Sequence, residues 1–198
     1  MRLIGDYFKL KLFNFKDEHT FPSFKAYRKA LSKEYRFTNP YHLSRGIYGE
    51  TPLAVLKQIA EGCALSPKDH VADLGCGRGR GVLFLSQLVG CRVTGIESVP
   101  AFIEKAERVK QKLGLQNVNF LQADMFKADL SPYSIVYLFG TCLEDHEIRK
   151  LAAKKPSRII TISYPLSDCD PSYKLVKSFP VLFPWGQTDA FLSVAKTF

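Results

Sequence analysis

Apolar and polar residues divide most of the chain into short apolar runs that alternate with longer amphipathic stretches. The apolar runs have the length and composition of buried strands and occupy residues 70–74, 92–96, 118–121, 135–139 and 158–163. Between them, apolar positions recur at the three- and four-residue spacing of helices in residues 80–89, 100–113 and 148–152. A further helix is expected to open with Thr51 as its cap and Pro52 as its first residue.

Five strand–helix units in succession predict an α/β fold built on a Rossmann-like, doubly wound parallel sheet. The run at 135–139 is wholly apolar, as expected of a central parallel strand. The end of the chain follows a different pattern, with extended stretches at 173–182 and 190–196 joined by residues 183–188. We expect this part to form an antiparallel hairpin that supplies strands six and seven.

The first part of the chain differs from the rest in charge and aromatic content. Residues 1–48 hold ten Lys or Arg and four acidic residues, and so contribute +6 of the net charge of +9. We expect residues 1–46 to form a small, basic N-terminal extension with one helix beginning near Pro22, and residues 47–198 to form the main domain. The basic extension indicates either an acidic partner, such as a nucleic acid, or a merely solvated surface.

Composition places the chain among ordinary globular proteins, with 46% hydrophobic and 24% charged residues. No apolar run approaches the roughly 20 residues that a spanning helix needs, so no transmembrane segment is expected. The five cysteines form no C-x-x-C pair, which favours reduced thiols and a cytoplasmic location. The four histidines have no metal-ligand spacing with cysteines or acids, and no metal is implied.

The candidate chemistry begins in the segment His70-Val-Ala-Asp-Leu-Gly-Cys-Gly-Arg-Gly-Arg-Gly81. A buried strand runs into four alternating glycines and then into a helix, which lets the backbone approach a ligand at the end of a parallel sheet. The segment lacks the G-x-x-x-x-G-K-[ST] pattern, so a nucleoside triphosphate loop is disfavoured.

Three acids define the ligand more closely. Asp73 precedes the first glycine, where a carboxylate suits a cationic ligand and repels a pyrophosphate. Glu97 ends the second strand, where an acid can accept hydrogen bonds from both ribose hydroxyls. Asp124 follows the third strand, within reach of an adenine amine. A nucleoside with a positive charge and no phosphate describes S-adenosylmethionine.

These features resemble the class I S-adenosylmethionine-dependent methyltransferases over roughly residues 47–198. The resemblance implies that the methionine and ribose parts of the cofactor are bordered by Asp73, Gly75, Cys76 and Gly77. It implies that Glu97 clamps the ribose and that Asp124 and Met125 border the adenine.

A narrower resemblance concerns the methyl acceptor. The segment Tyr48-Gly-Glu-Thr51 is similar to the non-SET histone lysine methyltransferases, whose corresponding loop folds over the cofactor, and implies that Tyr48, Glu50 and Thr51 border it. Val136-Tyr-Leu-Phe-Gly140 and Tyr164-Pro165 look like the lysine methyltransferases that act on an ATP-synthase membrane subunit. The chain departs from the histone enzymes after strand four, where Phe139-Gly140-Thr141 replaces a pair of asparagines.

A protein lysine is therefore the acceptor that the resemblance implies. A lysine amine with a pKa of about 10.4 is less than ~0.1% neutral at pH 7, so a desolvating aromatic slot would activate it. Tyr48, Phe139 and Tyr164 are the candidate residues for that slot. Glu50 is expected to hold the methionine amine or to orient the substrate. RNA methylation, small-molecule methylation and a binding module without turnover remain open alternatives.

Overall fold

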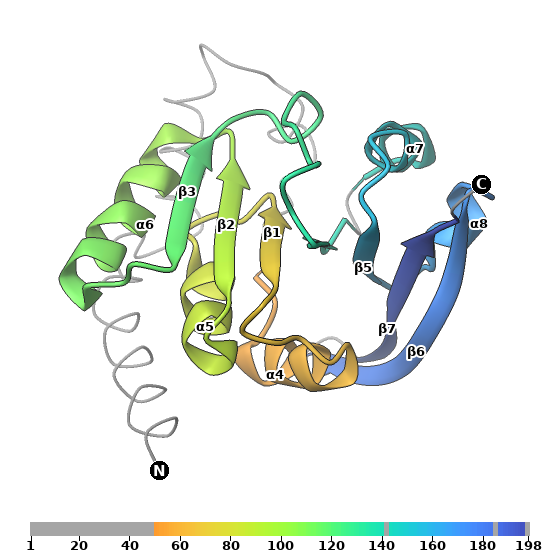
Figure 1. Ribbon diagram of the computed structural model, residues 1–198, viewed down its shortest axis with the longest axis horizontal. Coiled ribbons are helices and arrows are strands. Elements are labelled where there is room, and N and C mark those ends of the chain that lie inside the picture. The colour runs from red at the N-terminus through yellow and green to blue at the C-terminus, as the bar shows by residue number, and fades with distance from the viewer. Residues whose placement is uncertain (1–49, 141–142, 184–185, 197–198) are drawn as a thin grey trace.

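The computed structural model describes residues 50–140, 143–183 and 186–196, and Figure 1 shows their arrangement. Tyr48 and the basic extension lie outside the described residues, so the expectations placed on them remain predictions. The helices of the described part are α4 (Leu53–Gly62), α5 (Arg80–Val89), α6 (Pro100–Leu113), α7 (Asp145–Ala152) and α8 (Leu166–Cys169). The strands are β1 (His70–Leu74), β2 (Arg92–Glu97), β3 (Val118–Gln122), β4 (Ile135–Leu138), β5 (Arg158–Ile162), β6 (Tyr173–Phe183) and β7 (Gly186–Ala195).

The strands form one seven-stranded sheet in the order β3-β2-β1-β4-β5-β7-β6. The first five are parallel, and β7 runs antiparallel to both β5 and β6. The predicted doubly wound sheet with a terminal antiparallel hairpin is therefore confirmed. In Figure 1 the arrowheads of β1, β2 and β3 point to the same edge of the sheet, which brings the residues after these strands together.

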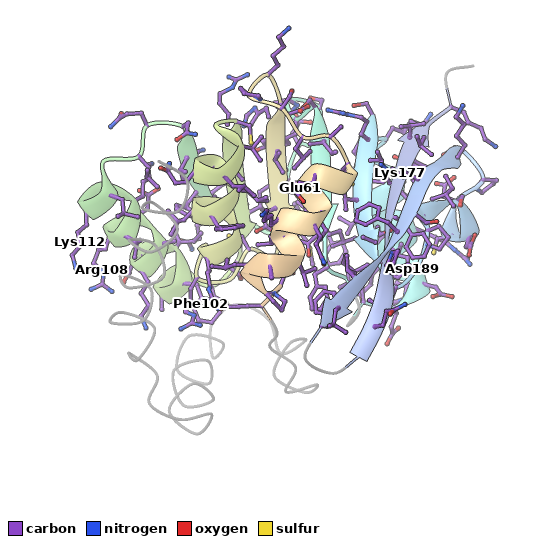
Figure 2. All side chains as sticks on the ribbon, turned by 90° about the horizontal axis from the view of Figure 1, so that it is seen from below. Glu61, Phe102, Arg108, Lys112, Lys177 and Asp189 are labelled. Carbon is purple, nitrogen blue, oxygen red and sulfur yellow. The ribbon has the colours of Figure 1, made fainter. Side chains whose placement is uncertain are left out.

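Apolar side chains on both faces of the sheet form the core. Helices α4, α5 and α6 cover one face, where Leu56, Val82 and Ala106 are buried against the strands. Helices α7 and α8 cover the other face with Leu151 and Leu166. Charged residues lie on the solvent side of α6, as Arg108 and Lys112 show in Figure 2. No helix in the described ranges is long and apolar enough to cross a membrane.

Two local predictions about elements were wrong. Helix α4 has Pro52 at its cap position and no side-chain cap, because the hydroxyl of Thr51 bonds to Tyr137 instead. The hairpin connection is shorter than the predicted 183–188, since Phe183 already pairs with Gly186 in the ladder between β6 and β7. The short helix α8 was not predicted.

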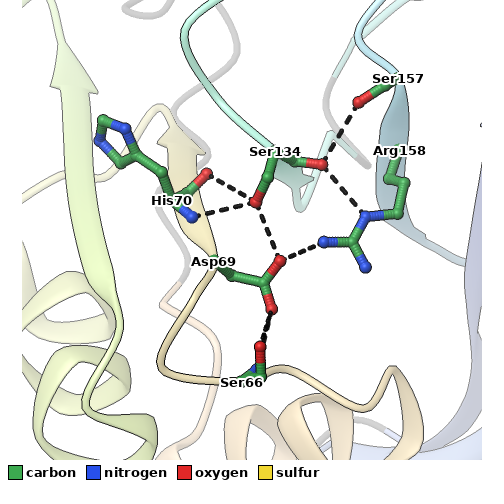
Figure 3. A network of polar contacts seen from close by, with 6 residues as sticks. All are labelled: Ser66, Asp69, His70, Ser134, Ser157 and Arg158. Atoms are coloured by element: carbon green, nitrogen blue, oxygen red, sulfur yellow. Dashed lines mark hydrogen bonds and ion pairs between the residues drawn. The ribbon is translucent and has the colours of Figure 1, made fainter.

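A polar network joins the amino ends of β1, β4 and β5, at the edge opposite the glycine turn (Figure 3). Asp69 accepts hydrogen bonds from the backbone and side chain of Ser66 at 2.8 and 3.0 Å, and from the Ser134 hydroxyl at 2.9 Å. It also forms an ion pair with Arg158, whose Nε donates to the carbonyl oxygen of Ser134 at 3.1 Å. Three strands that are distant in sequence are thus tied together by one buried carboxylate.

Candidate active site

The glycine turn between β1 and α5 is the centre of the candidate site. Gly75, Gly77 and Gly79 all have left-handed backbones, with φ of 71°, 55° and 75°. Such a backbone is strained for residues with a side chain, so these positions favour glycine. A side chain at Gly79 would collide with the ring of Phe120, whereas one at Gly75 would meet no atom of the described residues within 4 Å. The turn is therefore packed beneath and open at Gly75, where a ligand can approach the backbone.

Asp73 lies beneath this turn and is only 7% exposed. A Cβ atom on Gly81, at the start of α5, would lie 3.2 Å from Asp73 Oδ2, so the carboxylate packs closely against that helix. Burial, and then the nearby charge of Glu97, raise the pKa of Asp73 to about 7. No Lys or Arg of the described residues forms an ion pair with it. A buried carboxylate in this state favours a cationic ligand, which would stabilise its ionised form.

Glu97, at the end of β2, is oriented by backbone donors. Its Oε1 accepts from the amides of Ser98 and Val99 at 2.8 and 3.0 Å. Its Oε2 accepts from the amide of Gly77 at 3.0 Å, which joins the end of β2 to the glycine turn. A carboxylate oxygen has two lone pairs, so Oε2 retains acceptor capacity for a ligand hydroxyl.

Asp124 and Met125 follow β3 and are half-buried. Asp124 Oδ1 accepts from the amide of Phe126 at 2.9 Å and so stabilises the turn in which it lies. The amide of Ala123 donates to the carbonyl oxygen of Glu97 at 2.9 Å, which holds this loop against the end of β2. The structure therefore brings Asp73, Glu97 and Asp124 to the ends of three neighbouring strands, as the sequence predicted.

Cys76 packs into the floor of the turn. A Cβ atom on Gly95, in β2, would lie 2.5 Å from Cys76 Sγ, so the thiol occupies the space that the glycine leaves. Burial, followed by the charges of Asp73 and Glu97, raises the pKa of the Cys76 thiol well above its usual range. Cys76 is thus a neutral packing group beside the two acids and not a nucleophile.

Glu50 and Thr51, which precede α4, contact the same region. Glu50 is paired with Arg78 and Arg80 of the glycine turn. Thr51 Oγ1 lies 2.5 Å from the phenol oxygen of Tyr137 in β4. Tyr137 is not predictable as a site residue from the sequence, because an aromatic residue in a buried strand is typical of packing. The arginines alternate with glycines in the motif, which was the one signal that they face the site.

Aromatic side chains surround the end of β4. Phe139 stacks on Phe183 of β6, with ring centroids 5.3 Å apart and an interplanar angle of 14°. A side chain at Gly140 would collide with the phenol oxygen of Tyr164, which places that hydroxyl beside the residue after Phe139. Phe139 and Tyr164 therefore lie at adjacent strand ends. Phe183 was not predicted, because its position in the hairpin read as part of a loop.

The site fits the group that the sequence predicted. An open glycine backbone, a buried carboxylate with no basic partner among the described residues and an oriented carboxylate at the second strand end suit an adenosyl ligand that is cationic and lacks phosphate. No group of three or more His, Cys, Asp or Glu side chains in the described part of the chain is arranged to hold a metal ion.

Comparison with known proteins identifies related sequences. The model of a family described as "ANTKMT methyltransferase domain" matches residues 73–173, just over half of the chain. A 23S rRNA (uracil(1939)-C(5))-methyltransferase of Shewanella sediminis is 31% identical over 136 residues, which are 65% of this chain and 29% of that protein. A histone-lysine N-methyltransferase of Dictyostelium discoideum, H3 lysine-79 specific, is 26% identical over 163 residues, 72% of this chain and 8% of that protein.

The chain thus spans less than a third of the length of either curated relative. Among solved structures, the magnesium protoporphyrin IX methyltransferase of Synechocystis PCC 6803 superposes with a TM-score of 0.61 and 16% identity. That match covers 85% of this chain and 97% of the other. At this identity it shows a shared fold.

Proposed function

The chain belongs to the family of ANTKMT methyltransferase domains, and we propose that the acceptor of its methyl group is a lysine side chain of a protein. The chain is a class I S-adenosylmethionine-dependent methyltransferase with the seven-stranded sheet of that class. The acceptor is the open question, because one fold serves many acceptors.

In this proposal the carboxyl edge of the sheet holds the cofactor, which when bound supplies a methyl group on a positively charged sulfur. The Asp73 carboxylate balances positive charge near the turn, and Glu97 accepts from the ribose hydroxyls. Asp124 and Met125 border the adenine, and Gly75 with its neighbours Cys76 and Gly77 lets the backbone approach the ligand. Positioning and exclusion of water are the main contributions that a protein makes to such a displacement.

One structural observation supports the lysine acceptor above the others: the stack of Phe139 on Phe183 beside the hydroxyl of Tyr164. A lysine amine reacts only when neutral, and apolar ring surface lowers its pKa by penalising the charged form. Aromatic rings also attract an ammonium group within about 6 Å, which guides the side chain to the slot before it loses its proton. Tyr48 remains a predicted third wall of this slot, and it lies outside the described residues.

The named relatives support two candidate methyl acceptors, a protein lysine and RNA. The H3 lysine-79 specific enzyme from Dictyostelium discoideum supports a protein lysine. The ribosomal RNA enzyme from Shewanella sediminis favours RNA as the second candidate, together with the basic residues of the first 48 positions. RNA binding through such residues would weaken steeply with salt.

A label-transfer experiment separates these candidates. The full chain is incubated with methyl-labelled S-adenosylmethionine and with cell extract divided into protein, RNA and small-molecule fractions. We expect label in the protein fraction, on lysine after complete hydrolysis. Label confined to RNA, or to a small molecule, contradicts the proposal.

A pair of variants tests the aromatic slot. Phe139→Leu keeps apolar volume but removes the ring, and we expect it to lower transfer to the protein by about fivefold, since ring contacts contribute about 1 kcal/mol. Affinity for S-adenosylmethionine should remain unchanged. Phe126→Leu changes an aromatic residue near the predicted adenine region and serves as the matched control. This variant should still transfer the methyl group to the protein fraction. Equal transfer by Phe139→Leu and the unaltered chain argues against the slot.

A further inference from the structure

The segment that precedes α4 is tied to the glycine turn and to β4 by two successive residues. Glu50 contacts the arginines of the turn, 28 and 30 residues later in the chain. Thr51 contacts Tyr137, 86 residues later. Two neighbouring residues thus reach two different elements, both of which border Asp73.

The first tie is a charge cluster. Nε and Nη2 of Arg78 both donate to Glu50 Oε1, at 3.0 and 2.7 Å, and Nη1 of Arg80 donates to Glu50 Oε2 at 3.3 Å. The side chains of Glu50 and Arg78 are each only 18% exposed. Both carboxylate oxygens are therefore engaged by guanidinium groups, which are rigid, multidentate partners for a carboxylate.

The arginines of this cluster belong to the backbone that forms the candidate cofactor site. Arg78 stands between Gly77 and Gly79, whose left-handed backbones shape the turn. The amide of Gly77 is also the donor that orients Glu97. A displacement of Arg78 would therefore move the same peptide units that hold Glu97 in place.

The second contact, between Thr51 and Tyr137, lies beside Asp73 on the neighbouring strand β4. Tyr137 is 3% exposed and stands opposite Asp73 in the parallel pairing of β1 with β4. Paired residues of neighbouring strands point to the same face of the sheet, so the phenol and the Asp73 carboxylate share one buried region. Burial, which the bond from Thr51 only partly offsets, together with the charge of Asp73, keeps the pKa of the Tyr137 phenol above its usual range. The phenol is neutral and available for its hydrogen bond with Thr51.

From these contacts we infer that Arg78, Arg80 and Tyr137 are positioning residues, which hold Glu50 and Thr51 against the cofactor turn and so preorganise the site. Glu50 then acts through the arginines, whereas the sequence predicted that it would hold the methionine amine or orient the substrate. The inference rests on the cofactor site of the proposed function and is independent of the methyl acceptor.

The direction in which the affinity for S-adenosylmethionine changes when Arg78 is replaced distinguishes a positioning role from a purely electrostatic one. S-adenosylmethionine carries a net positive charge, so removal of the Arg78 charge would by electrostatics alone strengthen its binding. Loss of a positioning contact weakens binding. Arg78→Gln therefore has opposite expected results under the two explanations.

The test measures the dissociation constant of S-adenosylmethionine by calorimetry for the full chain. We expect Arg78→Gln and Glu50→Gln each to raise this constant by about tenfold, since a charge-assisted hydrogen bond contributes about 1.5 kcal/mol. The variant that carries both substitutions should have the same dissociation constant as a single variant, because both changes break the same contact between Glu50 and Arg78. Arg78→Lys, which keeps a charge that can reach Glu50, should recover part of the affinity. Tyr137→Phe and Thr51→Val should each weaken binding by about threefold, and no further when combined.

The exposed pair Lys57–Glu61 on α4 supplies the control, because Lys57→Gln also removes one positive charge from an ion pair, here a longer one of 3.8 Å, and should leave the constant unchanged. Melting temperatures are recorded for every variant, and Arg80→Gln, which removes the longer guanidinium contact to Glu50, at 3.3 Å, replaces Arg78→Gln if the latter does not fold. Unchanged or tighter binding by Arg78→Gln overturns the inference. Effects of Glu50→Gln and Arg78→Gln that multiply to about a hundredfold in the double variant also overturn it, since Glu50 would then contact the cofactor directly. Because no acceptor is present, failure of the lysine proposal leaves this test unaffected.

Discussion

At the scale of single residues, the two acids nearest the glycine turn are in contrasting environments. Glu97 accepts hydrogen bonds from three backbone amides, which hold its carboxylate in one orientation. Asp73 is buried beside it and has its pKa raised to about 7 by burial and by the charge of Glu97. The pair therefore combines a carboxylate oriented by backbone donors with a second, buried carboxylate that a cationic ligand can drive into the ionised state.

This difference predicts a pH dependence of cofactor binding. A cation favours ionised Asp73, so below its pKa of about 7 binding must displace a proton. We expect the affinity for S-adenosylmethionine to rise from pH 6 to pH 8, by up to about tenfold per pH unit below 7, and then to level off. Calorimetry at three pH values measures this, and the dependence should vanish in Asp73→Asn. Equal affinity at pH 6 and pH 8 in the unaltered chain would contradict the assignment.

Candidate site residues are predictable from the sequence where a local pattern, such as the end of an apolar strand, indicates them. Asp73, Glu97 and Asp124 are predictable because each lies within two residues of the end of an apolar strand, and parallel strands bring such ends together. Tyr137 could not be found in this way, since its partner Thr51 is 86 residues away and its own strand is uniformly buried. The pairing of Glu50 with Arg78 is likewise a tertiary contact that no local sequence pattern indicates.

At the scale of elements, close packing between the turn and β2 requires a glycine at position 95. An added Cβ atom there would lie 2.5 Å from Cys76 Sγ and 2.9 Å from side-chain atoms of Phe120 and Val82. These neighbours come from the turn, β3 and α5, so three elements would have to move apart. The absence of a side chain at Gly95 is what lets the turn sit directly on the second strand.

Gly95→Ala is accordingly expected to lower the free energy of unfolding by about 1–3 kcal/mol, the usual effect of overpacking. It should also weaken cofactor binding, because Cys76 is displaced. Denaturant titration and calorimetry measure the two effects. Gly114→Ala, at the left-handed end of α6 with no neighbour within 4 Å, is the control. It should cost about 1 kcal/mol of backbone strain and leave binding unchanged. Unaltered binding in Gly95→Ala would show that Cys76 does not support the turn.

The elements themselves were largely predictable because apolar period, glycine and proline are local signals. β1 and α5 follow the predicted bounds, and the terminal hairpin has the predicted direction. The connection of the hairpin was predicted too long, since Phe183 and Gly186 read as turn residues although they form its last pair. The cap of α4 was misjudged because Thr51 bonds to a distant side chain in preference to its own helix.

At the scale of the whole molecule, the two ends of the sheet have different roles. The carboxyl ends of β1, β2 and β3 carry the acids of the candidate site, and the amino ends of β1, β4 and β5 carry the network around Asp69. Burial alone would raise the pKa of Asp69. The hydrogen bonds from Ser66 and Ser134 and the charge of Arg158 outweigh burial and hold that pKa below its usual range. Stability and ligand binding should therefore be separable by mutation.

Asp69→Asn tests this separation. The folded pKa of Asp69 is below its unfolded value of about 3.9, so its contribution to stability is present above that pH and lost as the pH falls through the folded value. We expect Asp69→Asn to reduce the free energy of unfolding by about 2 kcal/mol at pH 7, and the difference from the unaltered chain to shrink below about pH 4. Urea titrations of both proteins at pH 7 and below about pH 4 measure the difference in the free energy of unfolding. A constant difference across this range, or a loss of cofactor affinity at pH 7, would show that the two ends are not separate.

In this account the buried carboxylate of Asp73 at the glycine turn holds the cationic cofactor, and the loss of this carboxylate should weaken binding without unfolding the chain. Because the pKa of Asp73 is higher in the folded chain, about 7, than in the unfolded chain, about 3.9, its contribution to stability declines as the pH rises between these values. Asp73→Asn should therefore be at least as stable as the unaltered chain at pH 8 in the absence of cofactor. Weaker binding by this variant could not then be attributed to unfolding.

The decisive measurement is a calorimetric titration of S-adenosylmethionine at pH 8 into the unaltered chain, Asp73→Asn and Asp129→Asn. Asp129 is an exposed acid bonded to Ser131, far along the chain from the turn, and its substitution is the matched control. We predict one equivalent bound by the unaltered chain and by Asp129→Asn with equal affinity, and at least about a tenfold loss in Asp73→Asn. No binding by the unaltered chain, or equal affinity in Asp73→Asn, would contradict the account.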